Sequence, residues 1–219
     1  MTLNYLFQNF LEQSEFARRA NISAPALEDL IGRQILPKPS YCYQAKGKVG
    51  SFISDHEDMQ LYRFHLKGHL AWINAIQKLR IENQQAAQNY FFDRYNSALR
   101  LFKESGIGKE LNVILPEILP MFDDPLRADA WGHFINGVYG VCTKDGMPET
   151  ILVKQVCVKF IDAITAAEHL RHSTSHCELL LKTVDLLDQA VSVFAPHELE
   201  KSSRQRCVLD VRARLKAGR

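Results

Sequence analysis

Pro37 and Pro39 determine where the first third of the chain can be helical. They directly follow the apolar pair Ile35 and Leu36. Each proline moves the residue before it out of the helical region, so a helix that precedes them must end sharply here. The aromatic run at 41–43 that comes next is typical of a β-strand. The chain therefore changes from a helical to an extended backbone at this corner.

Two short helices are predicted before the corner. Ser14 and Ser23 are each suited to the start of a helix, because a serine hydroxyl accepts a hydrogen bond from a free backbone N–H. Asn21 suits a tight exit from the first helix, since asparagine tolerates the left-handed conformation. We expect helices over 15–20 and 24–34, joined by a tight turn.

A small two-stranded wing and a closing helix are predicted after the corner. The strands are expected at 41–43 and 61–64, with a Gly/Lys turn at 46–48. Four apolar residues then recur on one side of a helix: Leu70, Ile73, Ile76 and Leu79. In order and spacing, residues 14–80 resemble the winged helix-turn-helix head of MerR-type regulators. The resemblance implies a fold that binds DNA.

The rest of the chain is predicted to be helical. Apolar stripes at helical spacing recur between turn signals, and no stretch alternates strand and helix as a parallel sheet would. The expected fold class is mainly α, with an N-terminal winged helix-turn-helix-like head followed by a helical C-terminal region. We place the head at residues 1–80 and the helical domain at 81–219.

The charges of the head argue against DNA binding. Its candidate DNA contacts are Arg18, Arg19, Arg33, Lys38, Lys46 and Lys48. A recognition helix needs donors for base edges and phosphates, but the second helix carries Glu28 and Asp29, with Arg33 as its sole cation. Residues 1–80 have a net charge of +3, which is small for a DNA-binding domain. DNA is therefore a partner that the architecture suggests and the charge does not favour.

Composition is that of a soluble protein. The chain has 219 residues, 46% of them hydrophobic, and a net charge of +2. No apolar run is long enough to cross a membrane, and polar residues interrupt the first apolar stretch, so no signal peptide is expected. The five cysteines are odd in number and widely spaced, which is typical of a reducing compartment. We expect a cytoplasmic protein without a membrane partner.

Three segments together resemble a known group of proteins. They are 36–41 with 51–52, 131–142 with 148–151 and Lys154, and 194–198 with 202–204 and 211–212. Together they resemble a bacterial family of uncharacterised proteins found near natural-product biosynthesis genes. The resemblance implies an accessory role in specialised metabolism, and it assigns no catalytic residue.

The segment around Arg204 is the strongest candidate for a small-molecule site. Ser202 or Ser203 can cap the last helix, which leaves free N–H groups beside the Arg204 guanidinium. His197, followed by Glu198, could donate a hydrogen bond or move a proton near neutral pH. Such a corner favours a carboxylate or a phosphate.

The neighbours of this corner decide between two interpretations. If it opens onto a pocket lined by Trp131 or Tyr139, the expected ligand is an amphipathic acid. In the alternative interpretation, Arg204 pairs with Glu198 or Glu200 and only ties down the C-terminus.

Two other groups of residues, a candidate nucleophile and a candidate metal site, have less support than the Arg204 segment. Cys142 could act as a nucleophile with His133 or His197 as its base, but nothing in the sequence brings them together. The group His169, His172, His176 and Cys177 contains an i,i+4 histidine pair, a spacing that can bind a metal. However, no glutamate stands beside His172, and 173–175 is typical of a loop or cap. We expect neither a metal nor a cofactor.

Three functions remain open from the sequence. The first is an accessory or small-molecule-binding protein of bacterial specialised metabolism. The second is a transcription regulator that binds DNA through its head. The third is an enzyme, for which no convincing catalytic set is present. The oligomeric state is left undetermined.

Overall fold

The predicted pair of helices near the N-terminus is present. In the computed structural model, which describes residues 2–123, 125–167 and 174–217, α2 (Gln13–Arg19) and α3 (Ala24–Gly32) are joined by a tight turn. Asn21 takes the left-handed conformation, with φ of 54°. The Ser23 hydroxyl accepts from the Ala26 N–H at 3.3 Å, so the expected cap of α3 is confirmed.

The expected cap of the first helix is wrong. Glu12, not Ser14, is the N-cap of α2, and its carboxylate accepts from the Ser14 N–H at 2.8 Å. Glu12 is the last residue of a short strand, β1 (Phe10–Glu12), which the sequence analysis did not predict. Its extended backbone leaves the carboxylate free to fold over the first turn of the helix, so α2 begins before Ser14.

The predicted wing is a much longer hairpin. Strands β2 (Tyr41–Gly50) and β3 (Asp55–Leu66) pair antiparallel along their whole shared length, and the turn lies at 51–54. The turn expected at 46–48 is therefore wrong. The observed turn is closed by two sets of hydrogen bonds. The Ser51 N–H donates to the Ser54 carbonyl at 3.0 Å, and the Ser51 hydroxyl accepts from the N–H groups of Ile53 and Ser54 at 3.2 and 3.3 Å.

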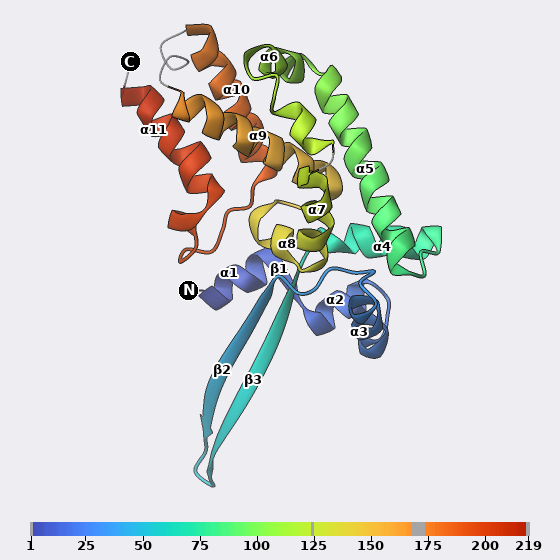
Figure 1. Ribbon diagram of the computed structural model, residues 1–219. Helices are drawn as coiled ribbons and strands as arrows, with labels where there is room; N and C mark the ends of the chain where they lie inside the picture. The colour runs from blue at the N-terminus through green and yellow to red at the C-terminus, as the bar shows by residue number, and fades with distance from the viewer. Residues whose placement is uncertain (1, 124, 168–173, 218–219) are drawn as a thin grey trace.

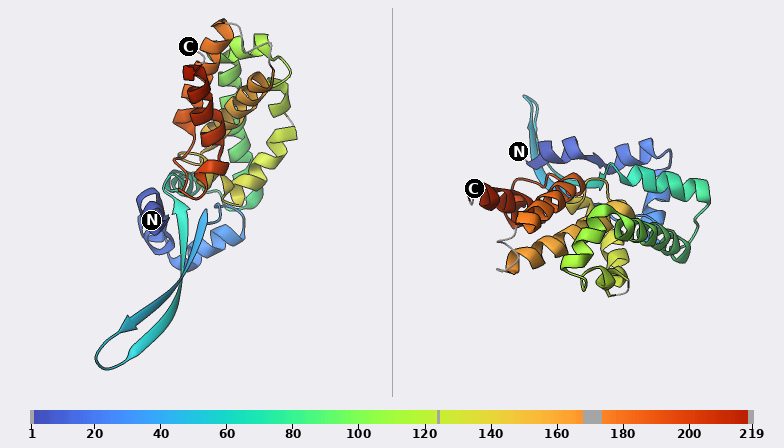
Figure 2. Two further views of the ribbon diagram at one scale, coloured as in Figure 1. Left: turned by 90° about the vertical axis from the view of Figure 1, so that its left-hand side faces the viewer. Right: turned by 90° about the horizontal axis from the view of Figure 1, so that it is seen from above.

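The hairpin projects from the body of the protein (Figures 1 and 2). Strand β1 pairs with the base of β3, which makes a three-stranded antiparallel sheet in the order β1-β3-β2. Aromatic side chains of β2, β3 and α1 (Thr2–Asn9) pack at this base. At the tip, Phe52 and Ile53 are 99% and 79% exposed.

The remainder of the described chain is helical, as expected for a mainly α protein. Asn83 caps the longest of these helices through its side chain, which accepts from the Ala86 N–H at 2.9 Å. The remaining helices are α4 (His69–Leu79), α5 (Gln84–Glu104), α6 (Gly106–Ile114), η1 (Leu119–Phe122), α7 (Pro125–Ile135), α8 (Val138–Cys142), α9 (Pro148–Ala166), α10 (Thr174–Ala190), η3 (Leu199–Lys201), η4 (Gln205–Leu209) and α11 (Asp210–Ala217). Within the described ranges, none of the helices is long and apolar enough to cross a membrane.

One hydrophobic core runs from the N-terminal helices into the helical region. It includes Phe16 of α2 and Leu27 of α3, and it continues through Trp72 of α4 to Phe91 and Phe134. The rings of Trp72 and Phe134 lie 4.7 Å apart, and those of Phe91 and Phe134 lie 4.8 Å apart. The boundary placed at residue 80 stays a prediction, and this core crosses it.

Two buried histidines lie where the sheet meets this core. His65 of β3 stacks on Phe16 with ring centroids 4.6 Å apart, and His69 opens α4 against Phe134. Neither ring nitrogen of either residue has a hydrogen-bond partner. Burial lowers the pKa of His65 to about 4 and that of His69 to about 3. Both rings are therefore neutral in the folded protein at neutral pH.

This burial predicts a loss of stability in mild acid. The unfolded chain binds protons at both histidines once the pH falls below about 6.5, whereas the folded protein does not until about pH 4 to 3. Stability should therefore fall as the pH falls through this window, by roughly 2 kcal/mol for each histidine by pH 4.5. Calorimetric melting at pH 7 and pH 4.5 measures this loss.

The variant His69→Leu should lose less stability than the wild type over the same pH interval. The matched control is His56→Leu, because His56 is exposed on the hairpin. If His69→Leu and the wild type lost equal stability between pH 7 and pH 4.5, His69 would not be a source of the acid sensitivity.

Candidate functional site

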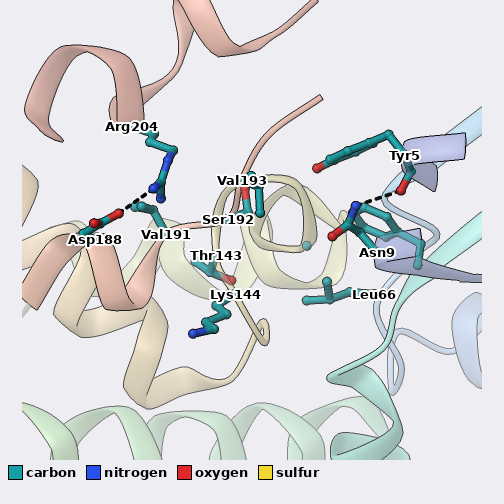
Figure 3. A pocket seen from close by; sticks show the side chains of 12 residues that line it. Tyr5, Asn9, Leu66, Thr143, Lys144, Asp188, Val191, Ser192, Val193 and Arg204 are labelled. Carbon is teal, nitrogen blue, oxygen red and sulfur yellow. Dashed lines mark hydrogen bonds and ion pairs between the residues drawn. The ribbon is translucent and has the colours of Figure 1, made fainter. Parts of the chain in front are cut away.

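A cavity of about 440 Å³ lies between the N-terminal segment and the C-terminal helices (Figure 3). One wall comes from α1 and the base of the sheet, and consists of Tyr5, Asn9, Phe10 and Leu66. Asn9 is held in place because its amide donates to the Tyr5 carbonyl at 2.9 Å. This wall combines an apolar surface with one phenol and one amide.

The floor of the cavity is the loop that follows α8. Thr143 and Lys144 of this loop line the cavity together with Gly140 of α8, and the Lys144 backbone N–H donates to the Ala190 carbonyl at 2.9 Å. Thr143 also forms an isolated antiparallel bridge with Val191, so the loop is joined to the end of α10. The Lys144 side chain is exposed and makes no hydrogen bond or ion pair with any described residue. It is a cation available to a ligand.

The opposite wall carries Arg204 and Asp188. Ser202 caps the turn that precedes Arg204: its hydroxyl accepts from the Gln205 N–H at 3.1 Å and donates to the Leu199 carbonyl at 2.6 Å. This cap directs the Arg204 guanidinium toward α10, where its Nη2 lies 2.7 Å from Asp188 Oδ1 (Figure 3). The residues Val191, Ser192 and Val193 complete the wall.

Asp188 is shared between two arginines. Its Oδ2 accepts from Arg212 Nη1 at 2.7 Å, and Arg212 also binds Asp185. Partial burial raises the pKa of Asp188, but the hydrogen bond from Arg212 and the charge of Arg204 outweigh it, so the pKa lies below its ordinary value. Oδ1 lies 2.7 Å from Arg204 Nη2, so each oxygen of the Asp188 carboxylate faces a different arginine. Of the two hydrogen bonds, the one from Arg212 lowers the pKa of Asp188 more.

The structure brings together only some of the residues predicted for the ligand site. Arg204 lines the cavity and Ser202 does not, and the partner of Arg204 is Asp188 rather than Glu198 or Glu200. The Ser203 hydroxyl is buried without a hydrogen-bond partner. Arg204 is thus both tied to the fold and present at a cavity wall.

His197 and Glu198 were also predicted for the ligand site, but they lie outside the lining of the cavity. The His197 ring is mostly exposed and lies 3.9 Å from Glu198. Glu198 accepts a hydrogen bond of 2.5 Å from the Tyr41 hydroxyl, which links the segment before η3 to the base of the hairpin. Neither residue lines the cavity.

Trp131 and Tyr139 belong to the core, not to the cavity. Trp131 packs between Phe91 and Phe134, with both ring centroids 5.7 Å away. The Tyr139 hydroxyl accepts from the Gln155 amide at 2.7 Å. The aromatic and polar residues that do line the cavity were not predicted from the sequence; they are Tyr5, Asn9, Phe10, Thr143, Lys144 and Asp188.

Of the cavity residues that were not predicted, Asp188 could have been found from its spacing in the sequence. Asp185 and Asp188 are spaced i,i+3 in an otherwise apolar stretch of α10, which indicates a carboxylate face that needs cations. The other residues come from α1, β1 and a loop, whose proximity is a property of the fold alone.

Each cation proposed to contact DNA has a partner within the chain. Arg18 and Arg19 both pair with Glu15, and Arg33 pairs with Asp29. Lys46 and Lys48 pair across the hairpin, with Glu57 at 2.6 Å and Asp55 at 2.9 Å. Lys38 donates to the side-chain oxygen of Asn136 at 2.9 Å.

Over the described ranges of the chain, the structure does not place the candidate nucleophile, Cys142, or the candidate metal ligands in the arrangements that their proposed roles would need. Cys142 Sγ accepts from Lys154 Nζ at 3.1 Å, and among the described residues neither His133 nor His197 forms a hydrogen bond with it. His169 and His172 lie outside the described residues. Among the residues that are described, no group of three or more His, Cys, Asp or Glu side chains could hold a metal ion.

Comparison with known proteins gives a family for the C-terminal region. A model of a family of unknown function, DUF6058, matches residues 87–216, which include the Arg204 side of the cavity and exclude α2, α3 and the hairpin. No curated protein and no solved structure matches the chain. Because the match spans more than half of its length, the chain belongs to the DUF6058 family.

Proposed function

We propose that the protein binds a small amphipathic acid in the cavity between the N-terminal segment and the C-terminal helices. The observation that carries the proposal is the Arg204 guanidinium at the cavity wall, whose one ion pair within the described structure joins its Nη2 to Asp188. An arginine in this position has N–H donors to offer a carboxylate or a phosphate. Asp188 keeps Arg212 as its second partner when a ligand engages Arg204.

The size and chemistry of the cavity support this ligand class. About 440 Å³ falls within the range typical of small-molecule sites. Lys144 adds a second cation, so positive charge exceeds the single carboxylate of Asp188. Phe10, Leu66 and Val191 offer apolar surface to the body of the ligand. Leu66 lies on the opposite side of the cavity from the Arg204–Asp188 pair (Figure 3).

The biological setting is proposed from the resemblance to the proteins near natural-product genes. The segments 131–142 and 202–204, which carry much of that resemblance, each contribute a residue to the cavity wall, Gly140 and Arg204. An accessory protein that holds an acidic intermediate or product of specialised metabolism fits such a cavity. Within the part of the chain that the structure describes, no catalytic set supports the alternative of an enzyme.

A DNA-binding regulator is the second candidate function. The arrangement of α2, α3 and the β2–β3 hairpin supports a winged helix-turn-helix head. The intramolecular ion pairs of Arg18, Arg33, Lys46 and Lys48 oppose DNA binding. We therefore infer that the head serves as a packing and interaction module.

Arg204→Ala tests the ligand site. We expect decanoate, as a probe, to raise the melting temperature of the wild type and to have no such effect on Arg204→Ala. The substitution itself should lower the free energy of unfolding by less than about 1 kcal/mol, because Arg212 still pairs with Asp188. Calorimetric titration with decanoate and with the uncharged 1-decanol separates recognition of the carboxylate from recognition of the chain.

Arg212→Ala is the matched control. It removes the other arginine of the same network, which does not line the cavity, so binding of decanoate should persist while stability falls by roughly 1–3 kcal/mol. Equal binding of decanoate by Arg204→Ala and the wild type would refute the role of Arg204. A loss of binding in both variants would point to the network as a whole.

DNA binding is expected to be weak and independent of sequence. At physiological salt the dissociation constant for duplex DNA should be no tighter than about 10⁻⁶ M, the range of non-specific binding. Selection from a random duplex library, followed by anisotropy measurements on the enriched sequences, tests this. Enrichment of one motif with nanomolar affinity would favour the regulator instead.

A further inference from the structure

The outer edge of β3 is unpaired over most of its length. Residues 64–66 of β3 pair with β1, whereas the stretch from Asp55 to Arg63 has a neighbour, β2, on one side only. This stretch belongs to the part of the hairpin that projects from the body (Figure 1). Unpaired N–H and C=O groups on a strand edge form a template for another strand, and an isolated two-stranded ribbon is marginally stable in water.

The same stretch exposes apolar side chains. Met59 and Leu61 are each 58% exposed, and Phe52 and Ile53 at the tip are more exposed still. Cross-strand ion pairs of Lys46 and Lys48 neutralise the cations of the hairpin, so it lacks the free positive charge that would draw a nucleic acid or an anionic membrane. Its chemistry fits another polypeptide strand.

A second copy of this chain can supply that strand, and symmetry then fixes which residues pair. In an antiparallel pair, residues directly opposite each other point to the same face of the sheet, so a two-fold axis must place one residue opposite its own copy. The middle residue of the stretch from Asp55 to Arg63 is Met59. We propose that two copies of the chain pair antiparallel along this edge, with Met59 opposite the partner's Met59.

The charges agree with this register. Asp55 comes opposite the partner's Arg63, once at each end of the pairing, and no two like charges lie directly opposite. A centre one residue nearer the tip would place Asp58 opposite its own copy, which is destabilising. Arg63 already holds Glu28 at 2.8 Å through Nη1, and its other N–H groups can serve a second carboxylate.

The ends of the pairing also agree with the fold. Beyond Arg63 the partner's edge is covered by β1, and beyond Asp55 the hairpin turns. The pairing thus ends on both copies where the free edge ends, and it brings the apolar tip to the base of the partner's hairpin. The edge of β2 cannot form an equivalent ion pair with itself, because its charged residues are all lysines.

A cysteine at the proposed axis tests the register. In a Cys42→Ser background, which removes the exposed cysteine of β2, Met59→Cys should form a disulfide-linked dimer under mild oxidation. Opposed residues of an antiparallel pair have Cα atoms about 4.5–5.5 Å apart, which is within the range that a disulfide spans. The matched control, Val49→Cys, is as exposed but lies on β2, and it should remain uncrosslinked.

Sedimentation equilibrium of the unmodified protein measures the dimer itself. Met59→Lys should raise the dimer dissociation constant by about tenfold or more, since two lysines would face each other across the axis. Its melting temperature at a concentration where both proteins are monomeric should be unchanged, because Met59 is exposed. A monomer at every concentration, a disulfide through Val49→Cys instead, or a dimer unaffected by Met59→Lys would each overturn the proposal.

Discussion

The packing of Trp72 against Phe134 and Phe91 holds the N-terminal elements to the helical region. Trp72 is fully buried, and its indole N–H donates to the Ile35 carbonyl at 2.9 Å, directly before the proline corner. This hydrogen bond satisfies a polar group inside the core and fixes the corner against α4. Because the corner sets where β2 begins, the position of the hairpin depends on the same contact.

The cavity is a consequence of this packing. The core joins α2, α3 and α4 to the helical region, while α1 and the base of the sheet form a separate aromatic cluster. Where that cluster faces the end of α10, the two surfaces are not filled by side chains, and the space is lined by Tyr5 and Phe10 on one side and Arg204 on the other. A ligand in this position would contact both parts of the chain. The Tyr41–Glu198 hydrogen bond is a second link between the same parts.

The electrostatics of the head follow from short-range pairing. Cross-strand partners on the hairpin and i,i+3 or i,i+4 partners on α2 and α3 neutralise its cations locally. Exposed pairs of this kind contribute little to stability, but they remove the free positive charge that a DNA-binding surface requires. The hairpin still has the unpaired edge of β3. The backbone N–H and C=O groups of this edge can bind another strand whatever the net charge of the hairpin is.

Features decided within a few residues could be predicted from the sequence. The left-handed turn at Asn21, the cap at Ser23 and the break at Pro37 depend on local backbone preferences, and all three are present. Local preference was misleading where a longer-range partner competed, as at 46–48, where glycine suggested a turn. The strands continue through these residues because their backbones pair in one register from Tyr41 opposite Phe64 to Gly50 opposite Asp55.

The site depended on contacts that spacing along the chain does not reveal. Arg204 and its cap could be recognised from the sequence, since Ser202 acts within one helical turn. The choice of Asp188 as partner, the burial of Trp131 and the approach of Tyr5 to the cavity are set by how distant helices pack. The sequence by itself thus determined the capped corner with its arginine, and only the tertiary structure decided what faces it, because side chains far apart in the chain meet through core packing rather than through local backbone geometry.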